Sequence, residues 1–271
     1  LERAIGLDER RPESHYLLGL CLVQQRRPSQ AAQSLRRAVT LDPGFLPAQE
    51  AMLDVLLSLD RHGEALRELE DLARRDPERP ERLASLGLAL ARAGRSDEAV
   101  VTLARATARF PDHPVLLAAL GEVWLRTGEA RGDRVALSKA VEALRRASER
   151  GPVTGHTLAL LGRAWLRLGD TRQALRALQA ATGLLPVNPD AFDHLADAAE
   201  ALGRFTTARE ALMRAAALTG DAGNARSRAD RAARIARLSQ RAGAPTDAVL
   251  WFERAVQLQP HDTVMRQRLA E

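Results

Sequence analysis

The sequence repeats with a period of 34 residues, and this period restricts the fold more than any other feature of the chain. Pro43, Pro77 and Pro111 are spaced at 34-residue intervals. Three alanines and three leucines recur at the same interval: Ala31, Ala65 and Ala99, and Leu35, Leu69 and Leu103. A recurring unit of this length is one supersecondary structure that cannot bury its apolar face alone, so successive units have to stack on one another.

The composition predicts that each unit is helical. Ala, Leu and Arg dominate the sequence, and aromatic residues account for 3% of it. Ala, Leu and Arg are strong helix formers, whereas the β-branched residues that strands prefer are sparse. We therefore expect each unit to form a pair of helices, A and B, and the chain to have an all-α fold.

Small and large residues hold fixed positions within each unit, counted from its first residue. In the unit that begins at Pro80, small residues stand at positions 8, 20 and 27, which are Gly87, Ala99 and Ala106. Large residues at positions 4, 7, 11 and 24 share one helical face and surround the close approach that the small residues allow. We expect the leucines at position 7 to be buried: Leu86, Leu120, Leu161 and Leu195. Glycines that permit a left-handed turn are expected between helices A and B. They are Gly94, Gly128, Gly169, Gly203 and Gly243.

This arrangement resembles the tetratricopeptide repeat, a 34-residue unit with a small residue at position 8, Ala at 20 and 27, and Pro at 32. The resemblance implies an α-solenoid, a right-handed superhelix of antiparallel helix pairs with helices A on the concave side. Full repeats are expected from residues 12, 46, 80, 114, 155, 189 and 229, and partial repeats at 1–11 and 263–271. We interpret residues 1–271 as a single solenoid that is part of a longer protein.

Two units are longer than the period. The fourth and the sixth unit span 41 and 40 residues. Seven additional residues correspond to about two helical turns, so a helix can lengthen without rotating its core face. We predict that Asp133 is the N-cap of a helix B that starts early, and that Asn224 caps a lengthened helix A.

The chain carries 40 basic residues against 35 acidic ones, a net charge of +5. Lys139 is the single lysine. Because arginine stays protonated to very high pH, the sequence pI of about 10.6 overstates the basicity. The preference for Arg over Lys is typical of a GC-rich, bacterial genome. Residues 226–241 contain six arginines and Asp230, so their net charge of +5 equals that of the whole chain.

Two interpretations of this basic segment compete. The face from Arg226 to Arg241 would attract nucleic acid phosphates, but no aromatic residue for base stacking lies between its arginines. Alternatively, its arginines pair with an acidic stripe on the preceding helix A. The residues of this charged seam are Asp190, Asp193, Asp197 and Glu200 with Arg234, Arg237 and Arg241. We favour ion pairing within the chain and treat nucleic acid as the less favoured partner.

The sequence contains no catalytic or metal motif. Its six histidines stand in no spacing typical of a zinc site, and Gly-rich phosphate loops and CxxC pairs are absent. Trp124 and Trp165 stand at position 11 and are expected in the core, and Cys21 has no second cysteine for a disulfide. We therefore expect a protein that is not an enzyme and needs no metal or cofactor. No apolar run reaches the ~18 residues that span a bilayer; a cytoplasmic location is expected, with the periplasm as the alternative.

A scaffold for protein interactions is the function that the resemblance implies. Positions 5, 9 and 12 of helices A line the concave face in this family. We predict that partner-binding residues stand there: Tyr16, Leu20, Val23, Asp54, Leu57, Leu88, Glu122, Leu125, Arg163 and Leu166. An exposed apolar strip often marks a binding groove; the alternative is that these side chains pack between neighbouring helices A. The family's clamp for a terminal carboxylate is not expected, because Tyr16 and Leu20 hold its positions in the first full repeat.

The expected partner is another protein or a peptide segment. The terminal repeats also allow association between copies of the chain, because a solenoid exposes an apolar face at each end. A fold alone does not establish a function. The alternatives to a scaffold are therefore a nucleic-acid-binding protein and the regulatory or docking region of a larger enzyme or secretion component.

Overall fold

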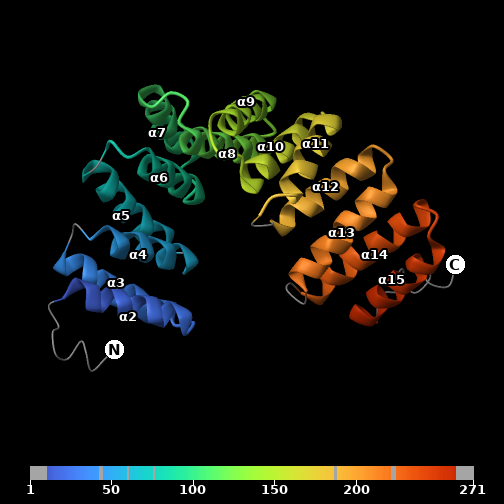
Figure 1. Cartoon of the computed structure of the whole chain (residues 1–271), viewed down its shortest axis with the longest axis horizontal. Coiled ribbons are helices and arrows are strands. Elements are labelled where there is room, and N and C mark those ends of the chain that lie inside the picture. The colour runs from blue at the N-terminus through green and yellow to red at the C-terminus, as the bar shows by residue number, and fades with distance from the viewer. Residues whose placement is uncertain are drawn as a thin grey trace. The chain divides into compact units, whose positions relative to one another are not determined.

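The computed structural model describes residues 11–42, 45–59, 61–75, 77–185, 188–220 and 224–260. These residues form fourteen α-helices and contain no strand, so the predicted all-α fold is confirmed (Figure 1). The partial repeat expected at 263–271, and all but residue 11 of the one expected at 1–11, lie outside the described residues.

Seven helices correspond to helix A of a repeat. They are α2 (Pro12–Gln24), α4 (Leu46–Ser58), α6 (Pro80–Arg92), α8 (Pro114–Arg131), α10 (Gly155–Leu168), α12 (Pro189–Ala201) and α14 (Ala225–Arg241). Six of them begin at the first residue of a predicted repeat, and α14 begins four residues before Ala229. Proline suits the first helical turn because the N–H that it lacks would have no partner there, which explains why several helices A start at a proline.

The other seven helices correspond to helix B. They are α3 (Pro28–Leu41), α5 (His62–Arg75), α7 (Ser96–Arg109), α9 (Arg134–Arg150), α11 (Thr171–Thr182), α13 (Phe205–Thr219) and α15 (Pro245–Leu258). Helices that follow one another in the chain pack together, as α2 does with α3 and α3 with α4. Successive helices A also touch, as α10 and α12 do.

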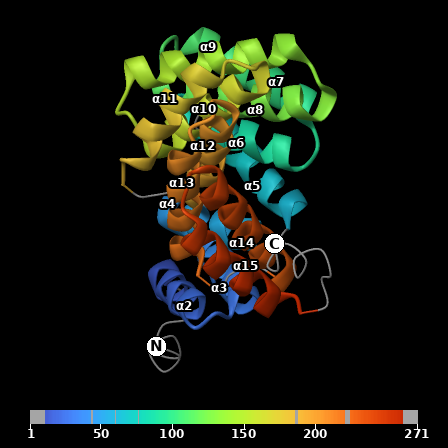
Figure 2. The same ribbon diagram turned by 90° about the vertical axis from the view of Figure 1, so that its right-hand side faces the viewer.

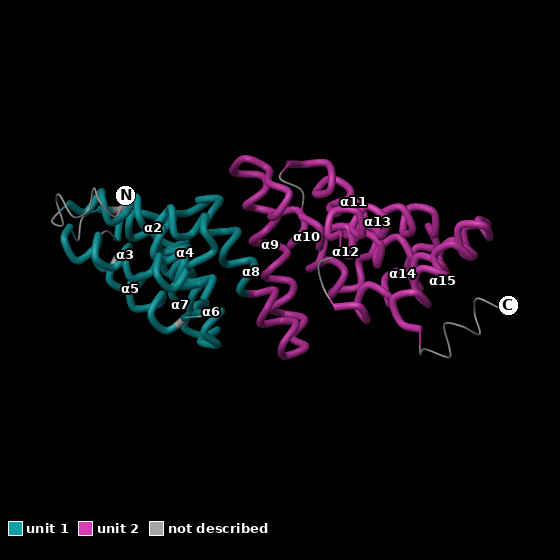
Figure 3. Tube along the Cα trace, turned by 90° about the horizontal axis from the view of Figure 1, so that it is seen from below, with its two compact units in different colours: residues 1–123 teal, residues 124–271 magenta. Residues whose placement is uncertain are grey.

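The chain divides into two compact units, Leu1–Val123 and Trp124–Glu271, and the boundary falls within α8 (Figure 3). The core of the first unit includes Leu35, Leu56 and Leu103. In the second unit, α12 to α15 follow one another in space as in sequence (Figures 1 and 2). The single uninterrupted solenoid stays a prediction.

Close contacts between glycine and leucine hold helices A and B together. A Cβ atom on Gly87 would lie 2.3 Å from Cγ of Leu103, and one on Gly162 would lie 2.4 Å from Cγ of Leu178. Separations under 3.0 Å are essentially never seen for real Cβ atoms. Leu103 and Leu178 are 0% exposed. Because the glycine at position 8 has no side chain, it leaves room for the leucine at position 24 of helix B.

The leucines at position 7 are buried in the second unit only. Leu161 and Leu195 are 7% and 6% exposed. Leu86 and Leu120 are half-buried and pack against the edge of the first unit's core. The prediction that all four are buried is wrong for these two, because their side chains lie at the margin of the core rather than inside it.

The prediction that Gly128 lies in a turn is also wrong. α8 continues through this residue to Arg131, and Gly132 makes the turn with a φ of 65°. A Cβ on Gly128 would lie 2.8 Å from the side chain of Leu137 in α9. The additional residues of this repeat therefore lengthen both helices and create a further glycine–leucine contact between them.

Both predicted N-caps are confirmed. Oδ1 of Asp133 accepts a hydrogen bond from the backbone N–H of Val135 at 2.8 Å, just before α9 begins. Oδ1 of Asn224 accepts one from the N–H of Ser227 at 2.7 Å, just before α14 begins. These caps satisfy N–H groups that would otherwise have no helical partner.

The substitution Gly87→Ala should lower the free energy of unfolding by about 1–3 kcal/mol, because the added methyl group overlaps Leu103. Gly63→Ala in α5 is the matched control, since no atom lies within 4 Å of the place where its Cβ would stand. There the same change should be neutral or stabilise by up to about 1 kcal/mol. Urea unfolding followed by circular dichroism measures both, and equal stabilities of the two variants would contradict the packing argument.

Candidate functional site

The predicted binding residues of the first unit lie on helices A and differ in exposure. Val23 on α2 is 43% exposed, and Asp54 on α4 is exposed. The other predicted residues of this unit are half-buried: Tyr16, Leu20, Leu57, Leu88 and Glu122. The ring of Tyr16 meets that of Phe45 edge to face, with 5.3 Å between centroids. Tyr16 therefore also has a packing role.

Leu125 is not a surface residue. It is 1% exposed and belongs to a core cluster with Leu137, Leu144 and Leu161. Its prediction as a binding residue is wrong, because the early start of α9 brings Leu137 into the same cluster. Buried alanines interrupt the strip as well. Ala84 and Ala159 stand at position 5 of their repeats and are 2% and 6% exposed. An apolar strip that is exposed along all the predicted positions does not exist.

Arg163 on α10 is held by an acidic residue of α8. Its Nε and Nη2 atoms donate to Oε1 and Oε2 of Glu129 at 2.8 and 2.5 Å. Nε of Arg167 donates to the same Oε1 at 2.7 Å. Leu166, the other predicted residue of α10, is half-buried and packs against the core of the second unit. The predicted concave residue Arg163 is thus engaged within the chain.

Glu129 is the key acidic residue of this cluster, and sequence reasoning missed it. Its side chain is 15% exposed. Burial alone would raise the pKa of this carboxyl, but hydrogen bonds from Arg163 and Arg167 outweigh burial and lower it. The available signal was the seven-residue insertion of this repeat, which the structure uses to carry α8 past Glu129 to Arg131.

The ion pairs predicted for the charged seam are present between α12 and α14. Nη2 of Arg234 lies 2.7 Å from Asp197 and 2.8 Å from Glu200. Nη1 of Arg241 lies 3.9 Å from Glu200. Arg231, which the sequence argument did not include, lies 3.1 Å from Asp193. It precedes Arg234 by three residues and therefore shares its helical face.

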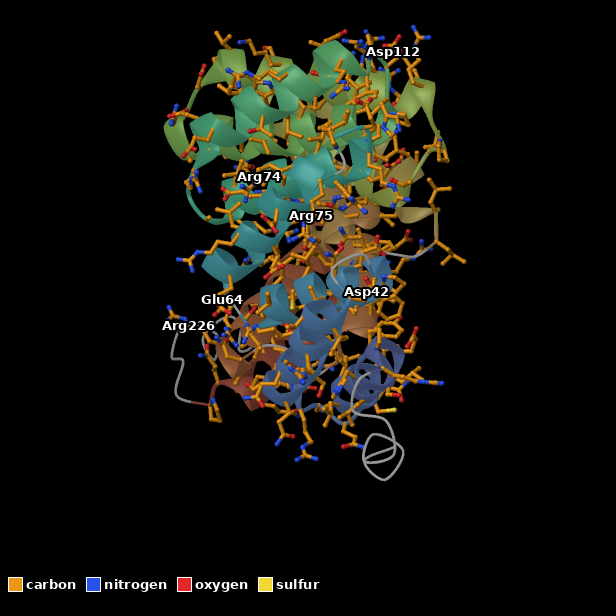
Figure 4. The ribbon with its side chains drawn as sticks, turned by 90° about the vertical axis from the view of Figure 1, so that its left-hand side faces the viewer. Asp42, Glu64, Arg74, Arg75, Asp112 and Arg226 are labelled. Atoms are coloured by element: carbon orange, nitrogen blue, oxygen red, sulfur yellow. The ribbon has the colours of Figure 1, made fainter. Side chains whose placement is uncertain are left out.

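Two other residues of the predicted seam, Asp190 and Arg237, have exposed side chains. Arg226 is likewise exposed near the start of α14 (Figure 4). The carboxylates of α12 therefore neutralise Arg231 and Arg234 in the middle of the arginine face. A phosphate-binding stripe would need the whole face.

Burial and ion pairing act in opposite directions on the seam carboxylates. Burial opposes the ionisation of Asp197, but hydrogen bonds from His194 and Arg234 outweigh it and lower the pKa. At Asp193 burial prevails over Arg231, and the pKa is raised. The charged seam therefore favours the ionised form of Asp197 more strongly than that of Asp193.

Helices B of the first unit also carry ion pairs. Nη2 of Arg36 on α3 lies 2.6 Å from Glu64 on α5. Asp71 receives Arg74 and Arg75 at 2.7 and 2.8 Å, and both arginines are visible on α5 in Figure 4. Exposed pairs of this kind contribute only ~0.2–1 kcal/mol each, so they orient side chains more than they stabilise the fold.

The described residues contain no group of three or more His, Cys, Asp or Glu side chains that could hold a metal ion. None of the helices described in the structure is both long and apolar enough to cross a membrane.

Comparison with protein families gives three matches, each described as a tetratricopeptide repeat. They cover residues 22–90, 80–123 and 159–226. A search of curated proteins found no match.

Several solved structures share the fold at low sequence identity. MamA is 20% identical over 66% of this chain and 90% of its own, with a TM-score of 0.55. YrrB, described as a TPR protein with an unusual peptide-binding site, is 14% identical over 75% of this chain and 98% of its own, with a TM-score of 0.58. A human IFIT1 dimer with m7Gppp-AAAA is 16% identical over 95% of this chain and 61% of its own, with a TM-score of 0.63. These likenesses concern the fold.

The substitution Glu129→Gln should lower the free energy of unfolding at neutral pH by about 1–3 kcal/mol, because Arg163 and Arg167 lose a charged acceptor. Glu142→Gln on α9 is the control, since Glu142 is 58% exposed and pairs with Arg145 of its own helix. Its cost should stay below about 0.5 kcal/mol. Urea unfolding monitored by circular dichroism measures both.

The effect at Glu129 should depend on pH. Because the folded-state pKa lies below the ordinary value of 4.5, the stabilisation is complete above pH 4.5 and is lost as the pH falls through the folded-state pKa. The stabilities of wild type and Glu129→Gln should therefore converge in acid. A constant difference down to the acid transition would contradict the assignment.

Proposed function

This chain belongs to the tetratricopeptide repeat family, and from that premise we propose that it is a non-catalytic scaffold that binds a segment of a partner protein on its helices A. The observation that carries the proposal is the surface of the first unit. There the exposed Val23 and Asp54 stand with the half-buried Leu20, Leu57 and Leu88 on α2, α4 and α6.

The chemistry of this surface indicates what it would bind. Val23 and Leu20 offer apolar contacts, and α2 touches α4, which carries the carboxylate of Asp54. A peptide segment with apolar anchors and a basic residue would match both features. Tyr16 and Glu122 belong to the same proposed surface. Arg163 and Leu166 form a separate part in the second unit, where Glu129 already orients Arg163.

The description of YrrB as peptide-binding supports the class of ligand, since its fold is similar to that of this chain. A nucleic acid partner has less support, because the α14 arginines that would contact phosphates pair with Asp193, Asp197 and Glu200. The cytoplasmic location, association between copies and a docking role in a larger protein stay predictions.

Val23→Asp should weaken binding of the partner by about tenfold or more, because it places a charge where an apolar anchor is needed. Val101→Asp is the matched control, since Val101 on the helix B α7 is 49% exposed. Photo-crosslinkers placed at positions 23 and 101 in the host cell would first identify the partner. Titration calorimetry with that purified partner would then compare the two variants.

The helical circular dichroism signal of both variants should match wild type, because both valines are substantially exposed. Crosslinking from position 23 alone is expected. Equal crosslinking from both positions, or equal loss of affinity in both variants, would show that helices A of the first unit are not the binding surface.

A further inference from the structure

A groove between two neighbouring helices B of the second unit is not used by the proposed function. One section of it, about 920 Å³ of open space, is lined by Arg172 and Arg176 of α11, by Arg204 and by Leu202. The adjoining section, about 700 Å³, is lined by Thr182 of α11 and by residues of α13. Gln179 borders both sections. We name the two sections together the α11–α13 groove.

The three arginines of the first section lack acidic partners. Arg172, Arg176 and Arg204 are exposed, and in the described part of the chain no carboxylate lies within ion-pair distance of them. The nearby acid Asp170 uses its side chain to cap α11, where it accepts the N–H of Gln173 at 3.1 Å. The amino-terminal end of α13, which carries a partial positive charge, has no side-chain cap. This end of the groove therefore attracts anions.

The spacing of the arginines suits carboxylates on a peptide. Arg172 and Arg176 are one helical turn apart, so their Cβ atoms are separated by about 6 Å. Acidic residues at alternate positions of an extended segment are about 7 Å apart. Each guanidinium can hold a carboxylate through two parallel hydrogen bonds. Leu202, which is half-buried and lines the same section, offers a contact for an apolar side chain.

The second section favours a peptide over a nucleic acid. Its only aromatic side chain, Phe192, is 4% exposed, so it cannot stack on a base. Glu210 and Arg214 carry opposite charges in this section. Glu210 can accept a peptide N–H, and Arg214 offers a fourth guanidinium for a carboxylate of the peptide. Thr182, Thr207 and Gln179 supply both donors and acceptors for a peptide main chain.

We infer that the α11–α13 groove binds an acidic peptide segment of a partner protein, with its carboxylates on Arg172, Arg176 and Arg204 and its main chain along Gln179 and Thr207. This site lies on helices B of the second unit. It is independent of the surface proposed on helices A of the first unit, and either can fail without the other.

The test uses a fluorescein-labelled peptide in which Glu alternates with Ser and Leu, and a matched peptide with Gln in place of every Glu. Fluorescence anisotropy with the full chain at about 50 mM and about 300 mM NaCl should show salt-sensitive binding of the Glu peptide and none of the Gln peptide. The double variant Arg172→Glu/Arg176→Glu should weaken binding by about tenfold or more.

The control is Arg67→Glu/Arg105→Glu, which makes the same change of charge on α5 and α7, where both arginines are exposed. It should leave the affinity within about twofold of wild type, as should Val23→Asp. Because the substituted arginines are exposed, all variants should keep the wild-type circular dichroism spectrum and melting temperature.

Three results would overturn the inference. They are no binding of the Glu peptide at low salt, an equal loss of affinity in the control double variant, and equally tight binding of a labelled oligothymidylate that Arg172→Glu/Arg176→Glu also weakens. The last result would identify the groove as a nucleic acid site instead.

Discussion

The contact between a glycine of helix A and a leucine of helix B is the constraint on which the rest of the structure depends. Gly19, Gly87 and Gly162 leave room for Leu35, Leu103 and Leu178, each of which is 0% exposed. In these three repeats the leucine of helix B occupies the space that a side chain at the glycine would fill. Once the pair is fixed, the remaining apolar faces of both helices are available to the next pair, and the stack can continue.

The long repeat shows how strongly this contact governs the packing. Gly128 stands seven residues after the Gly121 that holds position 8, and Leu137 stands seven residues before Leu144. Because seven residues are about two turns, the insertion extends α8 and α9 along the same faces. The contact of Gly128 with Leu137 then repeats the usual one farther along the pair. The insertion adds to the core without changing its pattern.

The elements could be predicted from the sequence because their signals are local. The period located the helix pairs, and the short polar residues Asp133 and Asn224 marked the two helix starts that depart from it. The ion pairs of α12 with α14 followed from the register of two standard positions. Gly128, Leu125 and Glu129 could not be placed, because all three belong to the repeat whose two helices are longer than the 34-residue pattern allows.

The candidate site was predicted less completely than the fold, since exposure depends on contacts between helices. Val23 and Leu125 both stand at position 12 of their repeats, yet Val23 is 43% exposed and Leu125 only 1%. A repeat pattern assigns both to one surface, and only the packing of α9 separates them. The α11–α13 groove could not be predicted for a related reason. Its residues come largely from two helices B, whereas the family resemblance indicates helices A as the binding surface.

The described arginines of the second unit differ in whether they pair with a carboxylate, and this difference affects which of them can bind a ligand. On helices A of the second unit, Arg163, Arg231 and Arg234 meet carboxylates of the neighbouring helix. Those charges cancel, and they fix the spacing of the helices instead of attracting ligands. Arg172 and Arg176 on α11, and Arg204 just before α13, line the α11–α13 groove, and no carboxylate of the described residues lies within ion-pair distance of them. The net charge of the chain is small. The surfaces that attract an anion are therefore those where carboxylates are absent, and not those where arginines are most numerous.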